Sequence, residues 1–143
     1  MRLEITRKTD LATQALLALG GASRSKSGEL ARRIGTTPGF LAQVMTPLVG
    51  RGWVHSEPGP TGGYFLSADL NEISVLQVIE AVEGPTESGR CVLERRPCDA
   101  TGACALHQPW TRARSQLLAE LAATKLSTLP EPATAHPNTE VAP

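Results

Sequence analysis

All three cysteines of this 143-residue chain, and one of its three histidines, lie in the stretch CVLERRPCDATGACALH, residues 91–107. Six residues separate Cys91 from Cys98, five separate Cys98 from Cys104, and two separate Cys104 from His107. Paired cysteines of structural zinc sites usually stand about two to four residues apart, so these gaps are wide for zinc. Thiolates are the ordinary ligands of iron–sulfur clusters, and three of them leave one coordination position to another group. The spacing therefore favours an iron–sulfur cluster of the 2Fe-2S or 4Fe-4S type.

Two other kinds of chemistry fit the same cysteines. An odd number of cysteines argues against a disulfide framework, and leaves a cluster-free thiol redox switch or structural zinc as alternatives. A thiol switch needs thiols of lowered pKa, which Arg90, Arg95 and Arg96 could provide, but these arginines would equally neutralise an anionic cluster. The chain has no Cys-x-x-Cys pair, phosphate loop or Ser/His/Asp set, so we do not expect an enzyme.

Charged residues are distributed unevenly between the two halves of the chain. Residues 1–56 hold eight Lys and Arg against three Asp and Glu, whereas residues 57–143 hold six against eleven. A basic half joined to an acidic half indicates a nucleic-acid partner. No stretch approaches the roughly 18 apolar residues of a membrane span, and we expect a cytoplasmic protein without a membrane partner.

The basic half begins with the pattern of two helices. Apolar residues at helical spacing predict a first helix over about 9–19, closed by Gly20-Gly21. A second, short helix is expected to begin with Ser27 as its N-cap and to end at Gly35, a residue suited to a left-handed turn.

The next elements complete a DNA-binding domain. Thr37 as N-cap and Pro38 at the first helical position predict a third helix, and the two helices with their short turn form a helix-turn-helix. Short β-type runs at 53–56 and 64–67, with a Pro- and Gly-rich tip between them, predict a hairpin. A hairpin in this place is a wing. The expected fold is mainly α with a small β-hairpin wing, and residues 1–84 form a winged helix-turn-helix.

The acidic half is expected to hold two further helices. Ser74 and Gln77 have the spacing of a capping box, at the start of a fourth helix whose apolar face is Val75, Val78, Ile79 and Val82. Residues 108–129 form an amphipathic helix with a short extension, longer than one small domain needs to cover, and we expect it to mediate dimerisation; folding back onto its own domain is the alternative. Between them, residues 85–107 form a cysteine segment that holds the cluster. Residues 130–143, with four prolines, are expected to be a disordered tail.

Several motifs together resemble a known family. These are MRL with TRKTDLA at the start, GFLAQVMTPL in the third helix, GPTGGYFL in the wing, ISVLQVIEAVEG after it, and the spaced cysteines followed by CALHQPW. They resemble the winged-helix iron–sulfur transcriptional regulators of the IscR, NsrR and RirA type, over residues 1–129. The resemblance implies a homodimer that binds a double-stranded DNA operator, with a cluster in the loop before the dimerisation helix.

The resemblance also suggests a fourth cluster ligand and a signal. His107 matches a histidine found after the third cysteine in one branch, and Asp10 matches an aspartate that completes the cluster from the partner subunit in another. The first cysteine gap is six residues where relatives usually have five, which leaves the cluster type open. The expected function is repression by the cluster-loaded form, with nitric oxide, iron or redox state as the signal and no other small-molecule substrate.

A winged helix also predicts which residues contact DNA. Thr37, Gly39 and Gln43 lie where the third helix would enter the major groove, and Gln43 could read adenine. Relatives carry a basic residue before the first wing glycine, where this chain has Pro58. Gly62 and Gly63 would let the wing backbone approach DNA closely. The candidate phosphate contacts are Arg2, Lys8, Arg32, Arg33 and Arg51.

Overall fold

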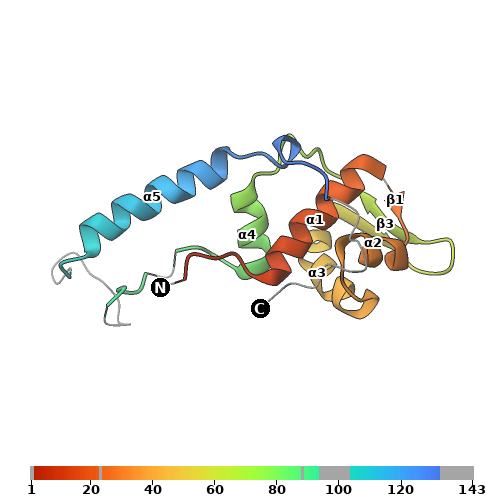
Figure 1. The fold of residues 1–143 in the computed structure, drawn as a ribbon, viewed down its shortest axis with the longest axis horizontal. Coiled ribbons are helices and arrows are strands. Elements are labelled where there is room, and N and C mark those ends of the chain that lie inside the picture. The colour runs from red at the N-terminus through yellow and green to blue at the C-terminus, as the bar shows by residue number, and fades with distance from the viewer. Residues whose placement is uncertain (1, 23, 88, 94–103, 133–143) are drawn as a thin grey trace, which may run out of the picture.

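The computed structural model describes residues 2–22, 24–87, 89–93 and 104–132. In this part of the chain, helices and a small sheet form a head, residues 7–83, from which one long helix projects (Figure 1). Cys98, Arg95 and Arg96 lie outside the described residues, as does most of the segment expected to be a disordered tail.

The head is held together by apolar side chains of its helices α1 (Arg7–Ala22), α2 (Ser27–Ile34), α3 (Pro38–Gly50) and α4 (Val75–Glu83). These side chains are aliphatic, as expected for a chain with 3% aromatic residues. The largest fully buried side chains come from α1 to α3, from the residues before α4 and from the segment after α5; they include Leu11, Leu16, Leu19, Leu30, Leu41, Met45, Leu48, Ile73 and Leu126.

The turn between α2 and α3 follows the local sequence signals. Gly35 adopts a left-handed conformation with φ of 77°, which ends α2. The Thr37 side chain accepts a hydrogen bond of 3.2 Å from the N–H of Phe40, which caps α3. The expected cap of α2 is wrong, because Ser27 is already its first helical residue and Lys26 stands at the cap position without a side-chain hydrogen bond.

The first helix is longer than its sequence pattern predicts. It starts two residues earlier, where Thr6 Oγ1 accepts a hydrogen bond of 3.2 Å from the Thr9 N–H. It also runs through Gly20 and Gly21 to Ala22. A Cβ on Gly20 would lie 2.5 Å from the Leu70 side chain, and one on Gly21 would collide with the Glu131 carboxylate. The two glycines therefore allow close packing rather than ending the helix.

The wing belongs to a sheet of three strands, not two. The hairpin strands β2 (Val54–Glu57) and β3 (Gly63–Leu66) are joined by a short strand β1 (Arg24–Ser25), in the order β1-β3-β2, all antiparallel. The fold class, mainly helical with a small wing, is confirmed.

Helix α4 begins as the capping-box pattern predicts. The Ser74 N–H donates to Gln77 Oε1 at 2.8 Å, and the Gln77 N–H donates to Ser74 Oγ at 3.2 Å. Val78 and Ile79 are buried, while Val75 and Val82 pack partly buried against the core.

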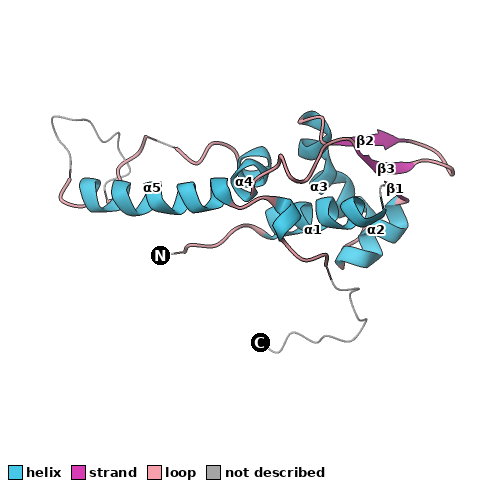
Figure 2. Ribbon diagram, turned by 90° about the horizontal axis from the view of Figure 1, so that it is seen from above, coloured by secondary structure: helices cyan, strands magenta, loops and turns pink. Residues whose placement is uncertain are grey.

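The long helix α5 (His107–Ala123) extends away from the head, at the end of the molecule opposite the wing (Figure 2). No residue of α5 is buried in the single chain. After α5 the chain returns to the head: the Val75 N–H donates to the Thr124 carbonyl and the Leu126 N–H to the Ile73 carbonyl, both at 2.9 Å. A 3-10 turn, η1 (Leu126–Thr128), then inserts the buried Leu126 into the core. Across the described part of the chain, none of the helices has the length and apolar character required to cross a membrane.

Candidate nucleic-acid interface and cysteine segment

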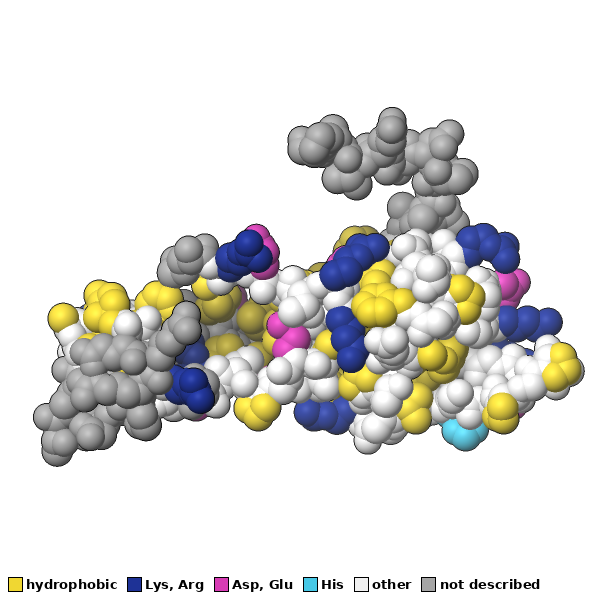
Figure 3. Space-filling model, turned by 90° about the horizontal axis from the view of Figure 1, so that it is seen from below, with side chains coloured by type: hydrophobic (Ala, Val, Ile, Leu, Met, Phe, Trp, Pro, Cys, Tyr) yellow, Lys and Arg dark blue, Asp and Glu magenta, His cyan; other side chains and the backbone are white. Residues whose placement is uncertain are grey.

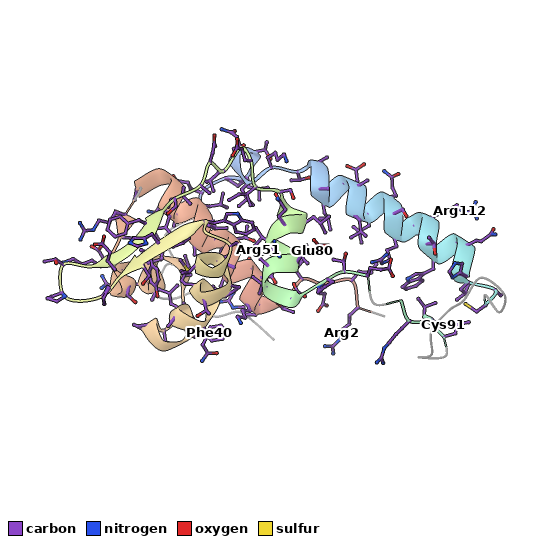
Figure 4. All side chains as sticks on the ribbon, turned by 180° about the vertical axis from the view of Figure 1, so that it is seen from behind. Arg2, Phe40, Arg51, Glu80, Cys91 and Arg112 are labelled. Atoms are coloured by element: carbon purple, nitrogen blue, oxygen red, sulfur yellow. The ribbon has the colours of Figure 1, made fainter. Side chains whose placement is uncertain are left out.

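The residues expected to read DNA lie on the outer side of α3. Thr37, Gly39 and Gln43 are exposed. Thr37 also caps the helix, and a Cβ on Gly39 would meet nothing within 4 Å, so the first turn of α3 is open to a partner. Phe40 lies at the outer end of the same helix (Figure 4). The structure therefore gathers these three residues on one accessible surface.

The expected phosphate contacts are more scattered. Arg32 and Arg51 are exposed on the head, and the Arg51 guanidinium carbon lies 5.9 Å from the centre of the Trp53 ring. Arg33 Nη2 is paired with Glu131 Oε2 at 3.1 Å, so this arginine is already engaged within the chain. Lys8 is half-buried on α1, and Arg2 lies between the head and the cysteine segment (Figure 4). Lys and Arg side chains are spread over the head in the view from below, with few acidic side chains among them (Figure 3).

The wing glycines have a role within the fold. A Cβ on Gly62 would collide with the carbonyl of Glu57, and one on Gly63 would lie 2.5 Å from the carbonyl oxygen of Ser25. Gly63 also has φ of 148°, which disfavours any side chain. Both glycines are therefore required by the close approach of the wing to itself and to β1. Their expected contact with DNA stays a prediction.

Sequence reasoning missed two basic residues near the wing, Arg24 and Lys26. Arg24 is placed there by β1, and Lys26 lines a hollow of about 270 Å³ between the wing turn and the start of α2, together with Ser27 and Tyr64. Partial burial raises the pKa of Tyr64 above its ordinary value. The position of Arg24 and Lys26 depends on the pairing between β1 and β3, which no local signal in the sequence predicts.

The cysteine segment meets the outer end of α5. Cys91 is buried, with 7% of its surface exposed, and lies beside the first turns of α5, far from α3 (Figure 4). Cys104 and His107 are half-buried, and the His107 N–H donates to the Cys104 carbonyl at 3.0 Å. Within residues 2–22, 24–87, 89–93 and 104–132, no three His, Cys, Asp or Glu gather as a metal site. Cys98 lies outside this part of the chain, yet two thiols and an imidazole at one helix end are donors that fit an iron–sulfur cluster.

Asp10 is apart from these groups within one chain. Its carboxylate accepts hydrogen bonds from Arg7 Nη1 at 3.3 Å and from Gln14 Nε2 at 3.0 Å, both on α1. These contacts explain the residue as part of the first helical turn. Its role as a ligand across a dimer stays a prediction.

A polar network ties the cysteine segment to α5 and α4. Arg114 Nη1 donates to Glu87 Oε2 at 2.7 Å, and Arg114 Nη2 donates to the Thr86 carbonyl. The Thr86 hydroxyl donates to Glu80 Oε1 on α4 at 3.0 Å. A hydrogen bond from the Gly89 N–H, together with the charge of Arg114, holds the pKa of Glu87 below its ordinary value. The first residues of the cysteine segment are thus bound on two sides.

A second network ties the end of α4 to the start of α1. The buried hydroxyl of Thr9 donates to Glu83 Oε2, which also accepts a hydrogen bond of 3.4 Å from the Thr6 N–H. Glu80 and Glu83 are on the same short helix. Helix α4 therefore contacts both the cysteine segment and α1, the first helix of the head.

Comparison with known proteins agrees with this architecture. The model of the Rrf2 family, described as an iron-dependent transcriptional regulator, matches residues 5–132. The HTH-type transcriptional regulator IscR of Pectobacterium atrosepticum is 33% identical over 113 residues, which cover 76% of this chain and 67% of that protein.

Solved structures share the fold. CymR, the global cysteine regulator of B. subtilis, aligns with a TM-score of 0.71 at 24% identity, over 88% of this chain and 95% of that one. The IscR of T. potens aligns with a TM-score of 0.64 at 23% identity, over 87% of this chain and 84% of that one. The family match over residues 5–132, with a relative at 33% identity, shows that this chain belongs to the Rrf2 family of DNA-binding transcriptional regulators, which are not enzymes.

Proposed function

We propose that the chain is a homodimeric repressor whose affinity for its operator DNA is set by an iron–sulfur cluster held by Cys91, Cys98 and Cys104. It acts in the cytoplasm and takes no small-molecule substrate beyond the signal that it senses. The observation that carries the proposal is that Cys91 lies beside the first turns of α5 (Figure 4) and that Cys104 accepts a hydrogen bond from His107, the first residue of that helix. Helix α5 buries none of its residues in the single chain.

The exposure of α5 supports the homodimer. Its apolar side chains include Leu117, which is 46% exposed. Leu106, the N-cap residue of α5, is 41% exposed. Helices of this length depend on packing for most of their stability, so α5 needs a partner surface. A second copy of α5 supplies a matching apolar face, and a two-fold dimer reads two half-sites about one helical turn of DNA apart.

The donors at this end support the cluster. A bound cluster would supply a group that reacts with nitric oxide or oxidants. The chain's own contribution is to keep Cys91 away from water and to fix Cys104 in the turn that starts α5. Of the two candidates for the fourth position, His107 is the one beside a cysteine; Asp10 of the partner subunit is the alternative.

The two networks through α4 support control of DNA binding. Arg114 and Thr86 join the start of the cysteine segment to Glu80, and Glu83 on the same helix holds Thr9 of α1. A change in the segment can therefore alter how α1 and α3 are held relative to α5. Coupling of about 1–3 kcal/mol between the two sites is enough for a working switch.

The test is to purify the full chain without oxygen and measure its visible absorption and native mass, beside a C98A variant and an S115A control on α5. We expect a brown dimer whose added mass gives the cluster type, a colourless C98A, and an S115A that keeps its colour. A colourless wild type with zinc would support the structural-zinc alternative, and one without metal the thiol switch. Either result would contradict the cluster while leaving DNA binding intact, and a brown monomer would contradict the dimer.

A further inference from the structure

The outer face of the wing sheet carries a row of three side chains. Val54, Tyr64 and Leu66 turn inward and pack on the core. Because side chains alternate along a strand, Phe65 between them turns outward. In the register of the sheet, Phe65 is paired with His55 on one side and with Arg24 on the other.

Arg24 and His55 both contact the ring of Phe65. The Arg24 guanidinium carbon lies 5.0 Å from the centre of the Phe65 ring, a cation–π distance. The centres of the His55 and Phe65 rings are 6.2 Å apart, and His55 Nε2 lies 3.7 Å from Glu57 Oε1. Arg24 Nη2 also donates to the carbonyl of Thr61, in the wing turn. The arginine therefore reaches from β1 to the tip of the wing and is oriented there.

The wing hairpin itself has no lysine or arginine. Residues 54–66 contain neither Lys nor Arg, and Glu57 is their acidic residue. A guanidinium has five N–H donors, and the bond to Thr61 uses one of them. Arg24 thus brings to the wing a positive charge, and a fork of donors, that the hairpin sequence lacks.

We propose that Arg24 is the DNA-contacting cation of the wing and that it enters the minor groove next to the base pairs read by α3. Strand β2 of the wing packs against α3, so with α3 in the major groove we place the wing beside the neighbouring groove. A narrow minor groove over A·T base pairs has an enhanced negative potential that attracts arginine. Arg24 is oriented by Phe65 and Thr61, and neither residue belongs to the cysteine segment.

The proposal is tested by DNA binding of the full chain and its R24A and R24K variants. The probes are a 30-base-pair A·T-rich duplex and a G·C-rich duplex of the same length, with fluorescence anisotropy between 50 and 200 mM NaCl. R112A is the matched control, since Arg112 is an exposed arginine on α5, at the opposite end of the molecule from the wing (Figure 4). Thermal unfolding of each variant shows whether it is folded.

We expect R24A to bind the A·T-rich duplex roughly tenfold more weakly and to reduce the slope of log affinity against log salt by about one. R24K should restore the salt slope but not the preference for A·T, because an ammonium lacks the planar fork. R112A should bind both duplexes as the wild type does. The proposal is overturned if R24A and R112A, both folded, change affinity and salt slope equally. A wild type that binds neither duplex would overturn it together with DNA binding itself.

Discussion

A single guanidinium on α5, that of Arg114, makes two contacts with the start of the cysteine segment. It binds the Glu87 carboxylate and the Thr86 carbonyl, four and five residues before Cys91. Glu87 is largely exposed, so the pair adds little to the stability of the fold. Its effect is on position, because it fixes the path of the chain toward Cys91.

Replacing Arg114 with alanine is expected to raise the pKa of Glu87 toward its ordinary value, although the Gly89 N–H keeps it somewhat lowered. A lowered pKa means that the fold favours the carboxylate, so the contact is present at neutral pH and is lost as the pH falls through the lowered pKa. An NMR titration of Glu87 in the full chain measures this shift, with R112A as control. Equal pKa values in the wild type and R114A would show that the contact does not form.

At the scale of elements, α5 differs from the helices of the head in what its apolar side chains contact. Helices α1 to α3 each bury an apolar side, whereas α5 touches the head through α4 and fully buries none of its own residues. Trp110, Leu118 and Leu121 are half-buried and Leu117 is exposed. An apolar surface of this kind is costly in water unless another chain covers it.

A glutamate at position 117 is therefore expected to separate the proposed dimer. Burying an unpaired carboxylate between two helices costs several kcal/mol, roughly enough to convert a micromolar dimer to monomer. Native mass spectrometry at micromolar concentration measures the change. S115E places the same charge on the same helix but off the apolar side, and it should remain dimeric. A dimeric L117E, or a monomeric S115E, would place the interface elsewhere.

The sequence was sufficient for elements whose signals are local. Gly35, Thr37 and the Ser74–Gln77 pair each act within a few residues, and all three positions end or start helices as predicted. Elements that depend on distant partners were not predictable. Strand β1 has two residues, too few to show alternation, and the close approach of Glu131 to the helical Gly21 joins residues far apart in the chain.

The candidate site divides in the same way. The three cysteines and His107 stand out by residue type and spacing alone. Arg24 and Arg114 do not, since their roles depend on contacts with Thr61 and Glu87 that are formed only in the folded chain. The engagement of Arg33 by Glu131 likewise spans 98 residues of sequence.

For the whole molecule, the surface that would read DNA and Cys91 lie at opposite ends, with α4 between them (Figure 4). The described part of the chain runs outward after α4 to Cys91 and returns to the head along α5. The return ends in the core of the head, where Leu126 is fully buried. The chain is thus bound to the head both before the cysteine segment, through Thr86 and Glu80, and after α5, through Leu126.

Replacing Leu126 with alanine is expected to lower the free energy of unfolding by about 2–5 kcal/mol, because the truncated side chain leaves a cavity in the core of the head. The midpoint of urea unfolding followed by circular dichroism measures this loss. L3A removes a leucine that is 73% exposed and should change the midpoint little. An L126A midpoint equal to that of the wild type would mean that the head is complete without the returning segment.

The burial of Leu126 also determines the order of events during synthesis. On the ribosome, residues are made from the N-terminus onward, and a domain completes its core only when its last core residue has emerged. The winged helix lacks that residue until translation has passed position 126, after Cys91, Cys98 and Cys104 have all been made. The nascent chain therefore presents its thiols before the head has finished folding.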